Sequence, residues 1–272
     1  MNAATQKNLK LDDQVTDDCF IKLLTAQDVL ITLRSISEEV TTTILDPWYN
    51  RGVGGVIDDY DSWLQEVLTA ATDISSHVFL WGFPDIICRM LDRLPPGTEL
   101  VAWLTWYYKN CPSVVRGWRS AQYTCLHIGR KGARIYPEHF LNDVQKHKMK
   151  EGKLRYMPGP PTVFEAPLNI GFVGKQEQTG HPAQKPISVI EPLILMSTTE
   201  GDVVLDPMCG AGTTGVACRR LHRSAILSDM SVDYLELTQG RIEASLDSHG
   251  HLCEKYSVKN SNMALFSSSL DD

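Results

Sequence analysis

The chain has 272 residues, of which 43% are hydrophobic, and a formal net charge of −7. This length fits one large α/β domain, or one domain with an insertion, and the hydrophobic share is sufficient for a sizeable core. Because there is no run of about 18 apolar residues and the polar first stretch lacks an apolar signal core, we expect no transmembrane helix and a cytoplasmic or otherwise intracellular protein.

The cysteines argue against a disulfide or zinc framework. Seven of them are scattered through the sequence, and no two form a Cys-x-x-Cys pair. An odd, dispersed set is typical of free thiols. We therefore expect neither a structural disulfide nor a metal centre.

Regular alternation of strands and helices begins at Phe20, after a polar and acidic N-terminal stretch. β-branched and apolar runs predict strands, and apolar residues at helical spacing predict helices. The predicted strands are residues 41–45, 77–82, 99–107, 203–205 and 224–229, and the predicted helices are 26–36, 63–71, 84–94, 187–198 and 231–242. This alternation predicts an α/β fold with a doubly wound, mostly parallel sheet.

Between the two regular halves lies a basic stretch, residues 129–180, that is rich in glycine and proline. From Lys109 to Arg155 there are eleven Lys and Arg residues against three acidic ones, a local charge of +8, so the remainder of the chain carries −15. We interpret the stretch as an insertion or small recognition module with little core of its own. An acidic protein with one basic segment is typical of nucleic-acid binding, and a solvated charged face is the alternative.

A glycine-rich stretch separates the predicted strand 203–205 from a helical run. From Asp206 to Gly215 it reads Asp-Pro-Met-Cys-Gly-Ala-Gly-Thr-Thr-Gly. Its glycines let a ligand approach the backbone, and the helix start offers free N–H groups. The stretch also satisfies the dinucleotide pattern Gly-x-Gly-x-x-Gly, so NAD or FAD is one interpretation, and a tight turn without a ligand is another.

Two acids favour a third interpretation, S-adenosylmethionine (AdoMet). Asp206 stands at the end of its strand, where it repels a pyrophosphate but stabilises an ammonium group. Asp229 lies 23 residues further on and suits ribose hydroxyls. Because ligands of such sheets sit beyond the carboxyl ends of the strands, Asp46 at the end of strand 41–45 is expected in the same crevice.

Three motifs resemble those of the amino-group DNA methyltransferases. The glycine stretch resembles their AdoMet-binding motif, His-Pro-Ala-Gln-Lys-Pro at 181–186 resembles the His-Pro-x-x-Lys-Pro element before it, and Asp-Pro-Trp-Tyr at 46–49 resembles the catalytic Asp-Pro-Pro-Tyr. Their order, with the catalytic motif first, is similar to that of the circularly permuted β class. The resemblance covers about residues 20–246 and implies a Rossmann-like methyltransferase sheet.

The resemblance implies a division of the chain and a set of cofactor contacts. The parts are a flexible N-terminus (1–19), a catalytic half (20–128), a basic target-recognition insert (129–180), an AdoMet-binding half (181–247) and a mobile tail (248–272). Asp28 and Val29 match the element that contacts adenine, although an N-cap is the alternative for Asp28, and Lys185 is placed beside the methionine end. The implied AdoMet-binding residues are Asp28, Val29, His181, Lys185, Asp206, Cys209, Gly210, Gly212, Thr213, Thr214 and Asp229.

The catalytic motif suits methylation of an exocyclic amine, whose lone pair is delocalised into the base ring. Asp46 supplies a carboxylate and Pro47 a main-chain carbonyl, two acceptors that localise the lone pair by binding the N–H groups. Tyr49 is implied as the face against which a flipped base stacks. Trp48 replaces the second proline of the family pattern, so its effect on the base pocket is open. An ordinary turn is the alternative for this stretch.

The implied substrate is double-stranded DNA. Asp46 favours adenine N6, because the cytosine-N4 enzymes more often carry Ser or Thr there, and cytosine N4 is the closest alternative. An RNA or protein methyltransferase and a non-catalytic DNA-binding subunit are further alternatives. A second subunit and a cognate restriction endonuclease are compatible partners. The candidates for phosphate contacts are Lys131, Arg134, Lys146, Lys148, Lys150, Lys153 and Arg155.

Overall fold

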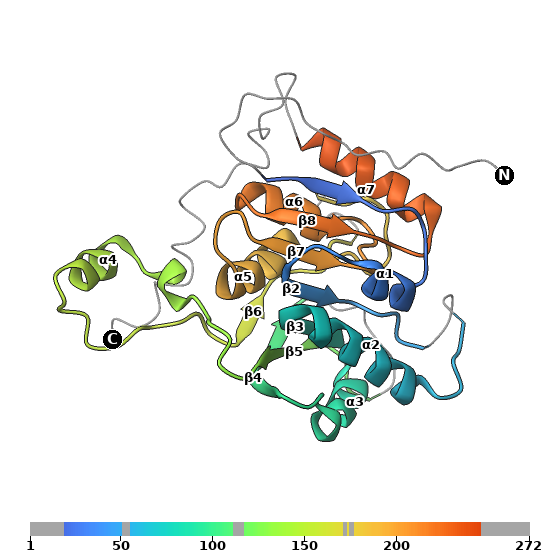
Figure 1. The fold of residues 1–272 in the computed structure, drawn as a ribbon, viewed down its shortest axis with the longest axis horizontal. Helices are drawn as coiled ribbons and strands as arrows, with labels where there is room; N and C mark the ends of the chain where they lie inside the picture. Colours follow the sequence, from blue (N-terminus) through green and yellow to red (C-terminus); the bar gives the residue numbers. More distant parts are fainter. Residues whose placement is uncertain (1–18, 51–54, 111–116, 171–172, 174–176, 246–272) are drawn as a thin grey trace.

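The computed structural model describes residues 19–50, 55–110, 117–170, 173 and 177–245, and its centre is one eight-stranded sheet (Figure 1). The strand order is β1-β8-β7-β2-β3-β5-β4-β6. The strands are β1 (Ile21–Leu23), β2 (Val40–Leu45), β3 (Ser75–Gly82), β4 (Thr98–Tyr107), β5 (Gln122–Arg130), β6 (Val163–Glu165), β7 (Val203–Asp206) and β8 (Ser224–Leu227). The helices are α1 (Val29–Ser35), α2 (Tyr60–Ile74), α3 (Pro84–Ile87), α4 (Asp143–Lys150), α5 (Ile187–Ser197), α6 (Thr213–Arg220) and α7 (Val232–Ala244), with 3-10 turns η2 (Cys88–Arg93) and η3 (Pro137–Phe140).

Helices cover both faces of the sheet, as the alternation of elements predicted. Successive side chains of a strand point to opposite faces, so each strand contributes to two cores. Ile44 and Phe79 belong to one cluster with residues of α5, α6 and α7. Leu45 and Val78 belong to a second cluster with residues of α1 and α2. The central strands are therefore covered on both faces, and they also bury polar side chains such as His77 and His127, whose rings contact each other at 3.1 Å.

The two predicted motifs meet because β2 and β7 are neighbours. These strands are parallel, with Thr43 opposite Leu205. Their carboxyl ends consequently lie at the same sheet edge, where Asp46 follows β2 and Asp206 ends β7. This confirms that the two acids lie at the same edge of the sheet.

One strand is antiparallel and was not predicted. β5 runs antiparallel to both β3 and β4. Its residues from Thr124 to Gly129 are all buried, so the sequence shows no polar–apolar alternation there. β5 starts at the same edge as the ends of β2 and β3, because Thr124 pairs with Gly82. It thereby brings a further set of side chains to the site.

Residues 131–162 leave the sheet after β5 and return as β6, which pairs with β4. In Figure 1 their helix α4 stands away from the sheet and from the other helices. Leu141 is the single buried residue between 131 and 162. We call residues 131–162 the projecting segment. The expected insert of residues 129–180 is longer, because its first two residues belong to β5 and residues 163–165 form β6. Among the described residues, no helix is both long and apolar enough to span a membrane.

Candidate active site

The loop after β2 is held to the start of α2 and to the segment before it by hydrogen bonds between side chains and the main chain. The Tyr60 hydroxyl donates to the Trp48 carbonyl at 2.6 Å. The Asn50 amide nitrogen donates to the carbonyl of Ile57 at 2.9 Å, and its oxygen accepts from the Ile57 N–H at 2.6 Å. Asn50 adopts a left-handed φ of 53°, which asparagine tolerates better than most residues. These bonds hold the turn of residues 46–50 in one conformation.

Trp48, the departure from the family pattern, contributes to the same fastening. Its ring packs against Trp63 at 4.8 Å and Tyr60 at 5.8 Å between centroids. Its Nε1–H donates to the carbonyl of Gly55 at 3.2 Å. The indole therefore packs on α2 and the segment before it, which leaves the acceptors of Asp46 and Pro47 unaltered.

The two carboxylate oxygens of Asp46 have different surroundings. Oδ2 forms an ion pair with the Lys185 ammonium, whose side chain is only 4% exposed. Oδ1 is buried and has no hydrogen-bond partner among the described residues. Lys185 was expected beside the methionine end of a cofactor, and in the structure its ammonium contacts Asp46. One carboxylate oxygen is thus held by an ion pair, and the other is buried without a hydrogen-bond partner among the described residues.

Tyr49 lies in a group of aromatic rings at the end of β3 and the start of β5. Its ring is 4.6 Å from Phe83 and 5.3 Å from Tyr123. Burial, together with Asp46 and Tyr123, raises the pKa of the Tyr49 phenol far above its ordinary value, so Tyr49 is neutral. The buried Trp106 ring stacks on Tyr123 at 5.7 Å, whereas the Trp81 ring is buried beside the Lys185 ammonium. Tyr123 was missed because its strand was not recognised.

The glycine loop before α6 has the backbone shape that its sequence predicted. Gly210 and Gly212 have φ values of 48° and 70°, a region that favours glycine. A Cβ on Gly210 would lie 3.0 Å from His181 Nε2, and one on Gly212 would lie 2.7 Å from Thr238 Cγ2. The His181 ring itself packs edge-on against Tyr234 at 4.4 Å. Neighbouring side chains therefore pack directly against this backbone.

Asp229 connects the glycine loop to the end of β8. Its Oδ2 accepts from the Gly210 N–H and its Oδ1 from the Ser231 N–H, both at 2.9 Å. Its carbonyl accepts from the Gln27 N–H at 3.2 Å, which brings the start of α1 to the same place. Asp28 accepts from the Leu30 N–H at 2.8 Å and so caps α1, the alternative that the sequence left open. Asp28, Asp229 and the glycine loop thus form one continuous rim.

Asp206 is a buried carboxyl whose pKa lies above its ordinary value. It accepts hydrogen bonds from the Thr214 hydroxyl and from the Met208 N–H at 3.1 Å. Burial outweighs these bonds and raises the pKa of Asp206 to about 7. A cation beside it would favour the ionised form. The nearby Cys209 thiol is not a nucleophile, because burial raises its pKa well above the ordinary value.

Arg241 and Thr238, which the sequence gave no reason to select, hold the glycine loop by hydrogen bonds. Arg241 of α7 donates to the Ala211 carbonyl at 2.9 Å and to the Thr213 hydroxyl at 2.8 Å. The Thr213 hydroxyl donates in turn to the Lys185 carbonyl at 3.0 Å. Thr238 donates to the Gly210 carbonyl at 2.8 Å. Only their contacts in the folded structure identify these two residues, because the spacing of residues along the chain does not reveal such contacts.

The predicted DNA contacts lie on the projecting segment. Arg134 pairs with Glu138 at 2.9 Å and lies 4.8 Å from the Tyr136 ring centroid, and Lys153 pairs with Glu151 at 3.0 Å. Three of the lysines belong to α4, which Figure 1 shows projecting into solvent. All seven candidates are exposed: Lys131, Arg134, Lys146, Lys148, Lys150, Lys153 and Arg155.

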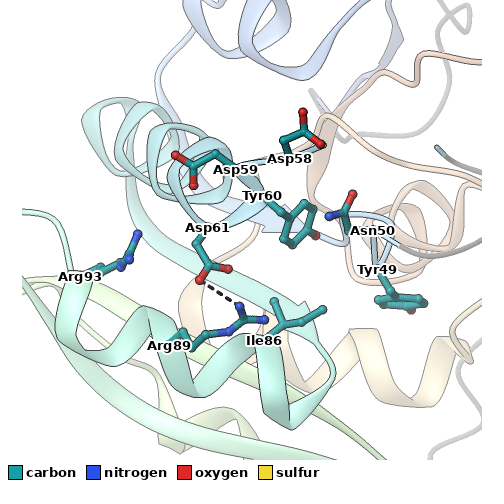
Figure 2. A pocket seen from close by; sticks show the side chains of 9 residues that line it. All are labelled: Tyr49, Asn50, Asp58, Asp59, Tyr60, Asp61, Ile86, Arg89 and Arg93. Atoms are coloured by element: carbon teal, nitrogen blue, oxygen red, sulfur yellow. Dashed lines mark hydrogen bonds and ion pairs between the residues drawn. The ribbon is translucent and has the colours of Figure 1, made fainter. Parts of the chain in front are cut away.

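A polar pocket of about 310 Å³ opens beside the turn of residues 46–50 (Figure 2). Arg89 and Asp61 form an ion pair of 2.9 Å on its wall. Tyr49 and Asn50 of the turn border the pocket on the other side. The complete lining is Tyr49, Asn50, Asp58, Asp59, Tyr60, Asp61, Ile86, Arg89 and Arg93.

A mostly parallel sheet thus sets a glycine loop beside the Asp46–Pro47 turn, the arrangement expected of an amino-group methyltransferase. Residues 40–240 match the N6_N4_Mtase family, described as DNA methylase, and the chain belongs to this family of amino-group DNA methyltransferases. It is similar to the Type II methyltransferase M.HpaI of Haemophilus parainfluenzae, with 26% identity over 251 residues, 85% of this chain and 77% of that protein.

Two solved structures share the fold. M1.HpyAVI in complex with S-adenosylmethionine (SAM) matches with a TM-score of 0.64 and 21% identity, over 82% of this chain and 99% of that one. The PvuII DNA methyltransferase, described as cytosine-N4-specific, matches with a TM-score of 0.59 and 16% identity, over 90% of each chain. At these identities the likeness concerns the fold alone.

Proposed function

We propose that the chain transfers the methyl group of AdoMet to adenine N6 in double-stranded DNA, on a base flipped out of the duplex. Membership of the family makes it a DNA methyltransferase; the donor, the atom and the base are the proposal. The observation that carries it is the Asp46 carboxylate, whose buried Oδ1 has no hydrogen-bond partner in the described part of the chain. A poor amine nucleophile needs such an acceptor.

The chain's own groups supply the positioning for this reaction. AdoMet supplies an electrophilic methyl group on a sulfonium. Asp46 Oδ1 and the Pro47 carbonyl would accept the two N–H bonds of the target amine, which returns its lone pair to nitrogen for in-line attack. Tyr49 would stack on the flipped base. As the new C–N bond forms, the C–S bond breaks with its electrons going to sulfur, and the amine proton then leaves to solvent.

The rim around the glycine loop fits AdoMet. Asp206, whose ionised form is disfavoured by burial, would gain from an ammonium group at its carboxylate. Asp229 is partly exposed at the end of β8, where a ribose hydroxyl could be bound, and the Asp28–Val29 turn lies beside it. A family member of the same fold was solved with this cofactor. The residues present therefore suit the methionine, ribose and adenine parts.

Asp46 is the reason for preferring adenine N6. Cytosine N4 is the second candidate, because an enzyme described as cytosine-N4-specific has the same fold. Trp48 gives no reason to change the choice, since it packs on α2. The exposed cations of the projecting segment would bind phosphates. The name of M.HpaI, a Type II methyltransferase, supports a cognate restriction endonuclease as a functional partner, and a homodimer would enlarge the small DNA-contacting surface.

Nucleoside analysis tests this proposal. The purified protein is incubated with random duplex DNA and AdoMet carrying a deuterated methyl group, and the digested DNA is examined by mass spectrometry. We expect labelled N6-methyladenine. Labelled N4-methylcytosine without labelled N6-methyladenine would contradict adenine N6 and support the second candidate, cytosine N4. Preferential labelling of an RNA competitor would contradict DNA as the substrate.

A further inference from the structure

Lys185 is fixed at its backbone and at its ammonium. Its carbonyl accepts from the Thr213 hydroxyl at 3.0 Å, at the first residue of α6. Pro186 follows it and precedes α5 with an extended φ of −63°. The ammonium lies 5.2 Å from the Trp81 ring centroid and 5.3 Å from that of Tyr123, distances typical of cation–π contacts. A lysine held in this way loses the freedom that an exposed lysine has.

The ammonium of Lys185 contacts Asp46 at one oxygen only. Oδ2 forms the ion pair, and Oδ1 is the oxygen without a partner among the described residues. Other ionisable groups that act on Asp46 or share its field are His181, Asp206, Tyr49, Tyr60, Tyr123 and Cys125. Of these, the tyrosines and the cysteine are kept neutral by burial, which raises their pKa values. The lysine is the cation that contacts the acid.

We propose that Lys185 is a positioning residue for methyl transfer: it holds Asp46 Oδ2 and leaves Oδ1 as the one carboxylate acceptor for the target amine. This rests on the proposed function. An ion pair at one carboxylate oxygen restricts rotation of the carboxylate, so Oδ1 keeps its place at the end of β2. A bound amine then finds two acceptors already in position, one for each N–H, and the reaction needs no rearrangement of the acid.

The role differs from that of a cofactor ligand. A lysine that binds the carboxylate of the methionine part would contribute to AdoMet affinity. A lysine that anchors Asp46 would contribute to the rate of the chemical step at saturating AdoMet. The two roles therefore separate in one set of measurements.

The test uses Lys185→Met, which keeps the length of the side chain without its charge, and Lys185→Arg, which keeps the charge. Lys22→Met is the matched control, because Lys22 forms a partly buried ion pair with Glu38 on the outer strand β1. AdoMet affinity is measured by calorimetry and methylation of duplex DNA by single turnover at saturating AdoMet. We expect Lys185→Met to lower the single-turnover rate about 100-fold, the cost of misplacing a reacting group, with AdoMet affinity changed less than threefold.

We expect Lys185→Arg to recover at least tenfold of that loss, and Lys22→Met to keep the rate of the unmodified chain. A Lys185→Met protein that loses AdoMet affinity tenfold but keeps its rate at saturation would overturn the proposal in favour of a cofactor ligand. A rate within threefold of the unmodified chain would overturn it too. If the unmodified chain itself methylates no DNA, the proposed function fails, and the loss is then not assigned to Lys185.

A second measurement keeps the contact testable without activity. Unfolding by urea is compared for Lys185→Met, Asp46→Asn and the double variant. If Lys185 acts on Asp46, the two destabilisations are coupled and the double variant is more stable than their sum predicts. Additive losses would contradict the ion pair as the link between the two residues, including when Lys185→Met folds too poorly for kinetic work.

Discussion

The sheet edge that carries Asp46 and the projecting segment of residues 131–162 are built in opposite ways. At the edge, contacts join residues that are far apart in the chain, such as Lys185 with Asp46 and Arg241 with Thr213. In the segment, the ion pairs join close neighbours, such as Arg134 with Glu138 and Lys153 with Glu151. The edge groups are buried or partly buried, whereas the segment's charged side chains are exposed.

This difference corresponds to two tasks. Buried groups with fixed partners can be pre-organised for a chemical step, because they need no rearrangement when the substrate arrives. Exposed local ion pairs contribute only about 0–1 kcal/mol each and are easily exchanged. The segment's cations can therefore leave their carboxylates for phosphates at little cost. Substitutions at the edge should affect chemistry and stability, and those in the segment should affect DNA affinity alone.

The largest effect is expected from Asp46→Asn. The variant keeps the shape of the side chain but replaces the charged acceptor, so single-turnover methylation should fall by about 10²–10³-fold, the cost of losing one pre-organised electrostatic contact. AdoMet and DNA affinities should change little. Asp73→Asn, an exposed position near the C-terminal end of α2, is the control and should leave the rate unchanged. A rate for Asp46→Asn within tenfold of the unmodified chain would contradict the catalytic role.

A large loss of stability is expected from Gly212→Ala. The new Cβ would meet Thr238 Cγ2 at 2.7 Å in a backbone with φ of 70°, so overpacking adds to backbone strain and should cost about 2–4 kcal/mol. Gly201→Ala is the matched control, since its φ is 85° but nothing lies within 4 Å of the Cβ. It should cost about 1–2 kcal/mol. Urea unfolding measures both, and equal losses would show that packing on Thr238 is unimportant.

A moderate effect confined to DNA binding is expected from neutralising α4. Lys146, Lys148 and Lys150, when changed together to Gln, remove three exposed charges. The slope of log Kd against log salt should fall by about 3, since each phosphate contact contributes about 0.9. Unfolding free energy and the single-turnover rate at saturating DNA should stay unchanged. An unaltered salt slope would place the DNA on another surface.

The smallest effect is a pH dependence of AdoMet affinity from Asp206. Its pKa near 7 means that the free protein carries a proton there at lower pH, and this proton must leave before an ammonium group is bound. Affinity should therefore weaken by up to about tenfold per pH unit below 7. Because the pKa is above the unfolded value of 3.8, this group's contribution to stability falls as the pH rises from about 4 to 7. Calorimetry from pH 5.5 to 7.5 checks the binding, and Asp206→Asn should remove the dependence.

The class of fold and the meeting of the motifs were predictable from the sequence. Alternating elements predicted the doubly wound sheet, and strand ends predicted that Asp46 and Asp206 share an edge, which the pairing of β2 with β7 confirms. β5 was not predictable from alternation, because its central residues are buried on both faces. Tyr123 and Arg241 were missed for a related reason. Their roles arise from contacts between distant elements, as does the pairing of Lys185 with Asp46.

The central claim is that the ends of β2 and β7 form a single methyl-transfer site. A crystal structure with the AdoMet analogue that carries an amine in place of the sulfonium methyl tests this most directly. We expect the α-ammonium of the analogue at Asp206 and its substituting amine within hydrogen-bonding distance of Asp46 Oδ1 or the Pro47 carbonyl. An analogue seated on the glycine loop with that amine directed away from Asp46 would contradict the claim.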